Sequence, residues 1–220
     1  MQSNLHNTSL KIVLLAALVC SISISYGQVK ANSKLIPSKI GFEFSLGNEN
    51  NVLFNDPDYT YQSNTYKIRL YYPLIKKKFV LSLIFEPQVV YLNHQLINEQ
   101  FVTPDEVNYL EKRDRFTKKK EMTLLAIGNS ISFQIILYKK LSLGVNGGIG
   151  LGYIDTATER LAKGFTFTEN LNIELEHPVN TSFNMYFSTG FGHVSNLNFQ
   201  RPNSGYNTLT TSLGISYNLK

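Results

Sequence analysis

From about Ser38 onward, apolar and polar residues alternate in short segments with a period of two. One such segment sets Leu141, Leu143, Val145, Ile149, Leu151 and Tyr153 against Ser142, Gly144, Asn146, Gly148, Gly150 and Gly152. This period places alternate side chains on opposite faces of a β-strand. One face is bulky and apolar, whereas the other is small, polar and almost uncharged. The pattern favours a narrow transmembrane barrel whose lumen is filled by short polar side chains.

Eight segments of this kind follow one another in the chain. We therefore predict an all-β protein, an eight-stranded antiparallel up-and-down transmembrane β-barrel. The predicted connections alternate between long and short, at residues 47–64, 75–78, 93–120, 139–140, 155–163, 177–180 and 199–206. A barrel with both chain ends in the periplasm has long extracellular loops and short turns in this order. In the longest loop, Thr103 followed by Pro104 predicts a helix start with Thr103 as its N-cap.

Charged residues on the predicted inner face have both signs. Glu43 and Glu86 oppose Lys67 and Arg69. Buried ions are tolerable when they are paired and costly when they are not, so these four side chains are expected to pair in the lumen. The alternative, a solvated face of a soluble sheet, fits the small and lightly charged polar face less well.

The first residues have the features of a secretory signal. Lys11 supplies a positive charge, residues 12–24 are mostly apolar or small, and Ser25-Tyr26-Gly27 provides small residues for cleavage. We predict a signal peptide at residues 1–27, and one outer-membrane barrel domain at residues 28–220. The apolar run is too short for a transmembrane helix, and no later run is long enough. Cys20, the only cysteine, lies inside the predicted signal.

Charge and histidine content narrow the range of partners. The formal net charge is +5, or 5 − 1 = +4 once Lys11 is removed with the predicted signal, and this mild excess favours an acidic surface such as phosphorylated lipid. Nucleic acid is not an expected partner of an exported chain whose basic residues are not interleaved with stacking aromatics. His94, His177 and His193 are widely separated, so no metal site is predicted. The residues do not decide whether the protein forms a homodimer.

His193 and Ser195 are the candidates for chemistry. They lie two residues apart in an alternating segment, so both project from its outward, apolar face near the predicted extracellular rim. A serine esterase needs a base for the hydroxyl proton, a group that orients the base, and donors for the oxyanion. Alone, this pair is a weak signal, because polar residues are common at the rim of a barrel.

A longer pattern carries a family resemblance. His193-Val194-Ser195-Asn196, followed by Pro202-Asn203-Ser204-Gly205-Tyr206-Asn207, resembles the lipid A 3-O-deacylase family, with its H-x-S-N motif and N-x-G turn. The resemblance implies hydrolysis of an ester-linked acyl chain at position 3 of lipid A, in lipopolysaccharide of the outer leaflet, without metal or cofactor. It also implies the site roles: Ser195 as nucleophile, His193 as general base, Asn203 as oxyanion donor, and Asn196 and Gly205 as residues that shape the turn.

One residue departs from that family. Its best-known members carry a glutamate where this chain has Asn207, which shares the outward face and would orient His193. An amide carbonyl can accept the imidazole N–H, yet exchanging the acid of a serine-protease triad for Asn lowers turnover by about 10⁴-fold. The predicted catalytic set is Ser195, His193 and Asn207. Glu169, another outward carboxylate, is expected to lie too deep to reach His193.

Basic residues in the longest predicted loop could bind the phosphates of lipid A. They are Lys112, Arg113, Arg115 and Lys118. Acidic neighbours dilute this charge, so a solvated loop is an equal alternative. The function predicted for the whole chain is that of an outer-membrane serine esterase acting on lipid A. The alternatives are a non-catalytic structural or adhesive barrel and an acyl transferase that uses the same serine.

Overall fold

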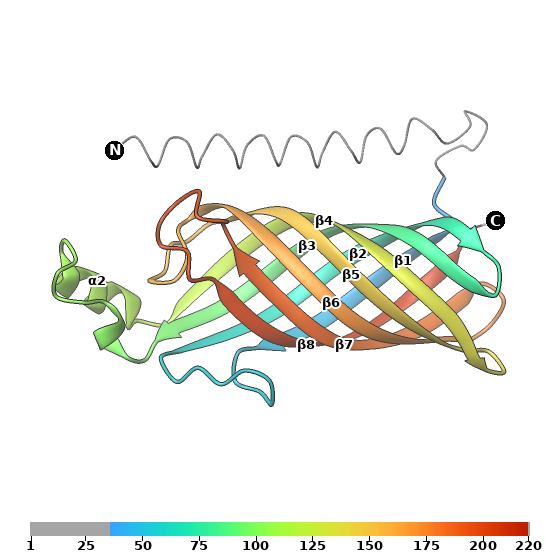
Figure 1. Ribbon diagram of the computed structural model, residues 1–220, viewed down its shortest axis with the longest axis horizontal. Helices are drawn as coiled ribbons and strands as arrows, with labels where there is room; N and C mark the ends of the chain where they lie inside the picture. The colour runs from blue at the N-terminus through green and yellow to red at the C-terminus, as the bar shows by residue number, and fades with distance from the viewer. Residues whose placement is uncertain (1–35, 220) are drawn as a thin grey trace. The chain divides into compact units, whose positions relative to one another are not determined.

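The computed structural model describes residues 36–219, which form eight antiparallel strands closed into one barrel (Figure 1). Each strand pairs with its neighbours in the chain, and β1 pairs with β8 to close the ring. The strands are β1 (Lys39–Asn48), β2 (Tyr59–Lys76), β3 (Phe79–Leu96), β4 (Lys120–Tyr138), β5 (Leu141–Ile154), β6 (Gly164–Pro178), β7 (Phe183–Ser195) and β8 (Tyr206–Asn218). The predicted fold class is confirmed. The predicted signal peptide lies outside the described residues.

The connections alternate in length as the sequence predicts. The long ones are residues 49–58, 97–119, 155–163 and 196–205, and the short ones are 77–78, 139–140 and 179–182. The two ends of the barrel are called below the long-loop end and the short-turn end. At the long-loop end, β2 and β3 extend further than predicted, because their backbone pairing continues to Tyr59 and Leu96.

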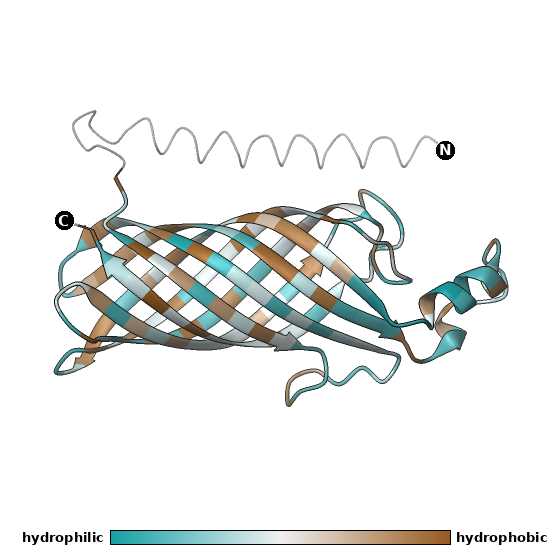
Figure 2. Cartoon of the chain, turned by 180° about the vertical axis from the view of Figure 1, so that it is seen from behind, coloured by the Kyte–Doolittle hydropathy of each residue, from teal (hydrophilic) through white to brown (hydrophobic). Residues whose placement is uncertain are grey.

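The outer face of the barrel is apolar. Along β7, Phe183, Met185 and Phe187 are exposed, whereas the intervening residues point inward and are buried. Figure 2 shows this alternation of hydrophobic and hydrophilic residues along the strands. A belt of exposed apolar side chains is stable where the surrounding solvent is lipid. The strands therefore form a transmembrane barrel. Among the described residues, no helix has the length and apolar character needed to cross a bilayer.

A network of ions fills the middle of the lumen. Arg69, which is 1% exposed, lies 3.0 Å from Glu43, 3.1 Å from Glu86 and 2.6 Å from Glu174. Lys67 lies 3.1 Å from Glu43. The predicted pairing of inward charges is thus confirmed, and Glu174 joins it from β6. Each of these carboxylates lies beside a buried cation, which offsets the cost of removing it from water.

The longest loop contains a 3₁₀ turn, η1 (Glu99–Phe101), and one helix, α2 (Tyr109–Phe116). The helix start predicted at Thr103 is wrong. The Thr103 N–H does donate to the Glu106 carboxylate (3.3 Å), but this contact belongs to a turn. Asn108 follows with a φ of 59°, a left-handed conformation that a right-handed helix cannot contain. The helix therefore begins only at Tyr109.

Candidate functional site

The candidate site lies where β7 reaches the long-loop end. His193 is paired across the sheet with Asn207 of β8 on one side and with Glu169 of β6 on the other. Residues directly opposite on antiparallel strands project from the same face of a sheet. The three side chains therefore form a row on the outer surface of the barrel.

His193 is held by Asn207. The Nδ1 atom of His193 lies 2.6 Å from the Oδ1 atom of Asn207. An amide oxygen only accepts hydrogen bonds, so Nδ1 carries the proton and donates it. In a neutral imidazole, Nε2 then keeps its lone pair and can take up a proton. The ring also lies parallel to that of Phe191, with an interplanar angle of 6° and centroids 6.4 Å apart.

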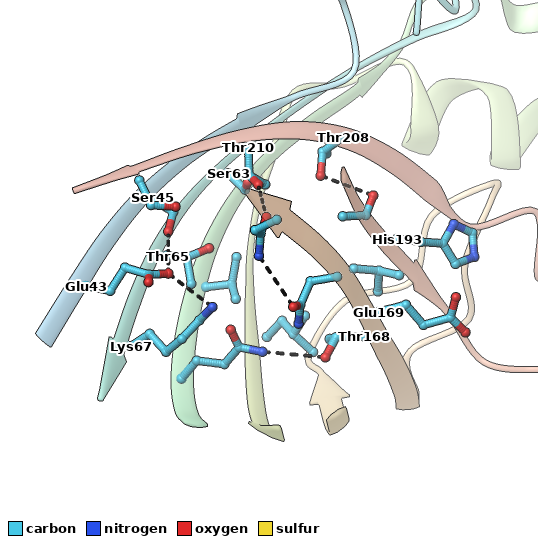
Figure 3. Close-up of a pocket in the computed structure, with 18 of the residues that line it drawn as sticks. Glu43, Ser45, Ser63, Thr65, Lys67, Thr168, Glu169, His193, Thr208 and Thr210 are labelled. Carbon is cyan, nitrogen blue, oxygen red and sulfur yellow. Dashed lines mark hydrogen bonds and ion pairs between the residues drawn. The ribbon is translucent and has the colours of Figure 1, made fainter. Parts of the chain in front are cut away.

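Glu169 lies closer to His193 than the sequence predicts. It is the direct cross-strand partner of His193, so the expectation that it lies too deep is wrong. The reason is the β6–β7 turn, which lies at residues 179–182 instead of 177–180. Because the turn sets the register of a hairpin, this shift changes which residue of β6 faces His193. Figure 3 shows the two side chains extending from neighbouring strands toward the same side, beside a polar cavity of about 80 Å³.

Ser195 is the last residue of β7, and it is 6% exposed. Its cross-strand partner is Phe167, which packs with Phe165 and Phe199 in an aromatic cluster (ring centroids 4.9–6.1 Å apart). Within residues 36–219, no side-chain hydrogen bond of Ser195 is recorded, so its hydroxyl is not hydrogen-bonded to His193. Catalytic hydrogen bonds are often long without substrate and shorten in the complex. The spacing of about 6.6 Å between Cα atoms two residues apart on a strand leaves room for that change.

Two asparagines join the end of β7 to the loop that follows it. The backbone N–H of Asn196 donates to Oδ1 of Asn203, and the Asn196 side chain donates to the Pro202 carbonyl (3.4 Å). The amide of Asn203 makes one long hydrogen bond, 3.4 Å to Asn198. The NH₂ group of Asn203 therefore retains a proton for another acceptor, while its Oδ1 is held by the residue that follows Ser195.

Gly205 lies against the His193 ring with a φ of +69°. A Cβ atom there would lie 2.6 Å from the Val194 carbonyl oxygen and 3.0 Å from Cε1 of His193. Arg160, from the loop between β5 and β6, holds this glycine. Its carbonyl accepts the Gly205 N–H (3.1 Å), and its Nε donates to the Gly205 carbonyl (3.0 Å). No local sequence pattern indicates this role for Arg160, because it depends on how two loops pack together.

The position of Gly205 leads to a prediction. Gly205→Ala is expected to displace the His193 ring and to lower kcat for ester hydrolysis by about 10²-fold, the scale of a misplacement near 1 Å. The control is Gly147→Ala, since a Cβ there would make an ordinary 3.7 Å contact with Leu171. Both proteins are compared by initial rates and by folded fraction. Equal rates for Gly205→Ala and the control would contradict the prediction.

A second polar pair lies buried at the long-loop end. His94 and Glu159 are 2.9 Å apart, and both are almost fully buried. The His94 ring stacks on Tyr59, with centroids 6.0 Å apart, and meets Tyr206 edge-on at 5.4 Å. In the sequence, His94 is only an isolated histidine. The even parity of His94 on β3 was the one available sign that it points inward. Among the described residues, no group of three or more His, Cys, Asp and Glu side chains could hold a metal ion.

The four basic residues predicted to bind phosphate have partners within their own loop. Lys112 pairs with Glu106 (2.9 Å), Lys118 pairs with Asp114 (2.6 Å), and Arg113 donates to the Val102 carbonyl (2.9 Å). Arg115 lies over the Phe116 ring, 4.5 Å from its centroid. Between residues 36 and 219, no contact of these four side chains with His193 or Ser195 is recorded. Phosphate binding by this loop stays a prediction.

Comparisons with known proteins complete the description of the site. The crystal structure of the outer membrane enzyme PagL aligns with a TM-score of 0.49 and 11% identity, covering 80% of this chain and 97% of that chain. Neisserial surface protein A aligns with a TM-score of 0.42 and 10% identity, covering 82% of this chain and 96% of that chain. OprG from Pseudomonas aeruginosa aligns with a TM-score of 0.42 and 8% identity, covering 85% of this chain and 98% of that chain. All three scores lie below 0.5, so the fold assignment rests on the strand pairing. A search of curated proteins finds no match.

A family model gives the decisive match. The model described as lipid A 3-O-deacylase (PagL) matches residues 39–216, a range that reaches into all eight strands. The match therefore includes His193, Ser195 and Asn207 together with the barrel that carries them. The chain is a bacterial outer-membrane barrel, and it belongs to the lipid A 3-O-deacylase family.

Proposed function

We propose that this protein is a serine esterase that removes the ester-linked acyl chain at position 3 of lipid A. The observation that supports this most directly is the His193–Asn207 hydrogen bond on the outer face of the barrel, two residues before Ser195. The lipid-facing position suits a substrate whose acyl chains lie in the bilayer. The substrate class comes from the family to which the chain belongs.

In the proposed reaction, Oγ of Ser195 attacks the acyl carbonyl carbon while Nε2 of His193 takes the hydroxyl proton. The NH₂ group of Asn203 donates to the oxyanion that forms. Collapse of the tetrahedral intermediate breaks the ester C–O bond, and His193 returns the proton to the sugar oxygen. A water molecule then attacks the acyl-serine by the same route and releases the fatty acid. Asn207 keeps the Nδ1–H of the imidazole in place throughout.

The test is direct. The purified barrel, folded in detergent, is incubated with lipid A, and the products are measured by mass spectrometry. We expect the loss of one acyl chain from lipid A and the appearance of a free hydroxy fatty acid. If the wild-type protein releases no fatty acid, the deacylase proposal is wrong, and the chain is a non-catalytic barrel of the same family.

Asn207 provides a graded test of the histidine. Asn207→Ala is expected to lower kcat by roughly 10- to 100-fold, because the imidazole loses its orientation but keeps its proton-accepting nitrogen. Asn207→Glu should preserve or raise kcat, since a charged acceptor holds the imidazolium more strongly. Thr211→Ala, also outward-facing on β8, is the matched control. A rate for Asn207→Ala equal to that of the control would remove Asn207 from the mechanism.

A further inference from the structure

We propose that Glu169 is a positioning residue whose carboxylate stabilises the charged form of His193 from the β6 side. This inference rests on the proposed function, because it concerns the proton that His193 takes from Ser195. The observation behind it is the row of three residues on the outer surface, in which His193 lies between Asn207 and Glu169.

The sheet register brings Glu169 within reach of His193. Directly opposite residues on antiparallel strands have Cβ atoms about 4.5–5.5 Å apart. A glutamate side chain can span that separation by rotation about its own bonds. The two side chains already extend to the same side of the sheet in Figure 3, and Glu169 is exposed and so free to rotate.

The other neighbours of Glu169 are apolar. Its cross-strand partner on β5 is Ile149, and the flanking outward residues of β6 are Phe167 and Leu171. Within the described part of the chain, no ion pair or side-chain hydrogen bond of Glu169 is recorded. A carboxylate on the lipid-facing surface is costly without a partner. His193 is the one titratable group among the residues that flank Glu169 on its own strand and on both neighbouring strands.

The chemistry of the site calls for a negative charge at this position. When His193 takes the Ser195 proton, the imidazole becomes a cation. Asn207 can accept the Nδ1–H but carries no charge. A carboxylate on the neighbouring strand stabilises that cation, and more strongly where lipid and protein exclude water. Glu169 takes up no proton in this scheme. It acts through His193 and does not touch the substrate.

The test removes the charge and then moves it to the other side of the histidine. In the full-length protein assayed with lipid A, Glu169→Gln is expected to lower kcat by about 10- to 100-fold with KM unchanged. Glu169→Asp should retain part of the rate. In the double variant Glu169→Gln/Asn207→Glu, the charge lies on the β8 side of His193, and kcat should recover.

Controls separate this role from a structural one. Glu121→Gln removes an exposed carboxylate from β4 and should leave both kcat and KM unchanged. If Glu169→Gln does not fold, Glu169→Leu removes the same charge and suits a lipid-facing surface. An active wild type together with a charge-removing variant of unchanged kcat would overturn the role of Glu169 while leaving the deacylase proposal intact. An inactive wild type would instead refute the proposed function itself.

Discussion

Ser195→Ala and His193→Ala are each expected to lower kcat for deacylation by on the order of 10⁴- to 10⁶-fold. The serine hydroxyl is the attacking atom, and without the imidazole it keeps its proton. The barrel should remain folded in both variants, because the structure records no side-chain hydrogen bond of Ser195 within residues 36–219 and only one of His193. The measurement is the initial rate of fatty-acid release from lipid A by folded protein.

The double variant sharpens this expectation. Since the two groups act as one unit, Ser195→Ala/His193→Ala should be about as slow as either single variant, not slower by the product of the two effects. Ser204→Ala, in the loop after β7, and His177→Ala, at the short-turn end of β6, are matched controls that should retain the wild-type rate. Wild-type activity in Ser195→Ala would exclude a Ser195 nucleophile.

Arg69→Leu should destabilise the barrel more than any change on its surface. It would leave Glu86 and Glu174 in the lumen without an ion-pair partner, whereas Glu43 would keep Lys67. Removing one partner of a buried ion pair typically costs about 3–5 kcal/mol, because the remaining charges are uncompensated. We expect a clear fall in the urea midpoint of unfolding. The chain has no tryptophan whose fluorescence could report unfolding. The folded fraction can instead be followed by the gel mobility of unheated samples.

The control for this experiment is Lys140→Ala, which removes an exposed cation from a short turn. Its midpoint should match that of the wild type. An equally unchanged midpoint for Arg69→Leu would mean that lumen water solvates the three carboxylates well enough to replace the guanidinium.

The alternation of residues predicted which face each strand residue occupies, but not which residues lie opposite one another. Parity placed His193 outward and Arg69 inward, and the structure agrees. The partner of His193 on β6 depends on the position of the β6–β7 turn. The predicted turn lies two residues too early in the chain, so the predicted register placed Glu169 too far from His193. Local signals at the turn, His177 to Asn180, did not distinguish between nearby hairpin registers.

Contacts between loops could not be predicted from local patterns. Two such contacts involve the loop between β5 and β6. Arg160 donates a hydrogen bond to the Gly205 carbonyl, and Glu159 pairs with the buried His94. That loop has no periodicity that would indicate its path. The start of α2 was missed for a different reason. The residues after Thr103 satisfy the rule for a helix start, and one left-handed residue, Asn108, delays the helix.

The lumen network also bears on how the barrel assembles. Glu43 and Glu86 lie on β1 and β3, the two strands that flank Arg69 on β2, so an open sheet of three strands can bring them together. Glu174 lies on β6 and reaches Arg69 only across the interior. Its charge is therefore neutralised only in a ring that has closed. Closure of the barrel is therefore cooperative. In a partly assembled sheet, the Glu174 carboxylate is still unpaired on the inner face, which becomes buried only when the ring closes.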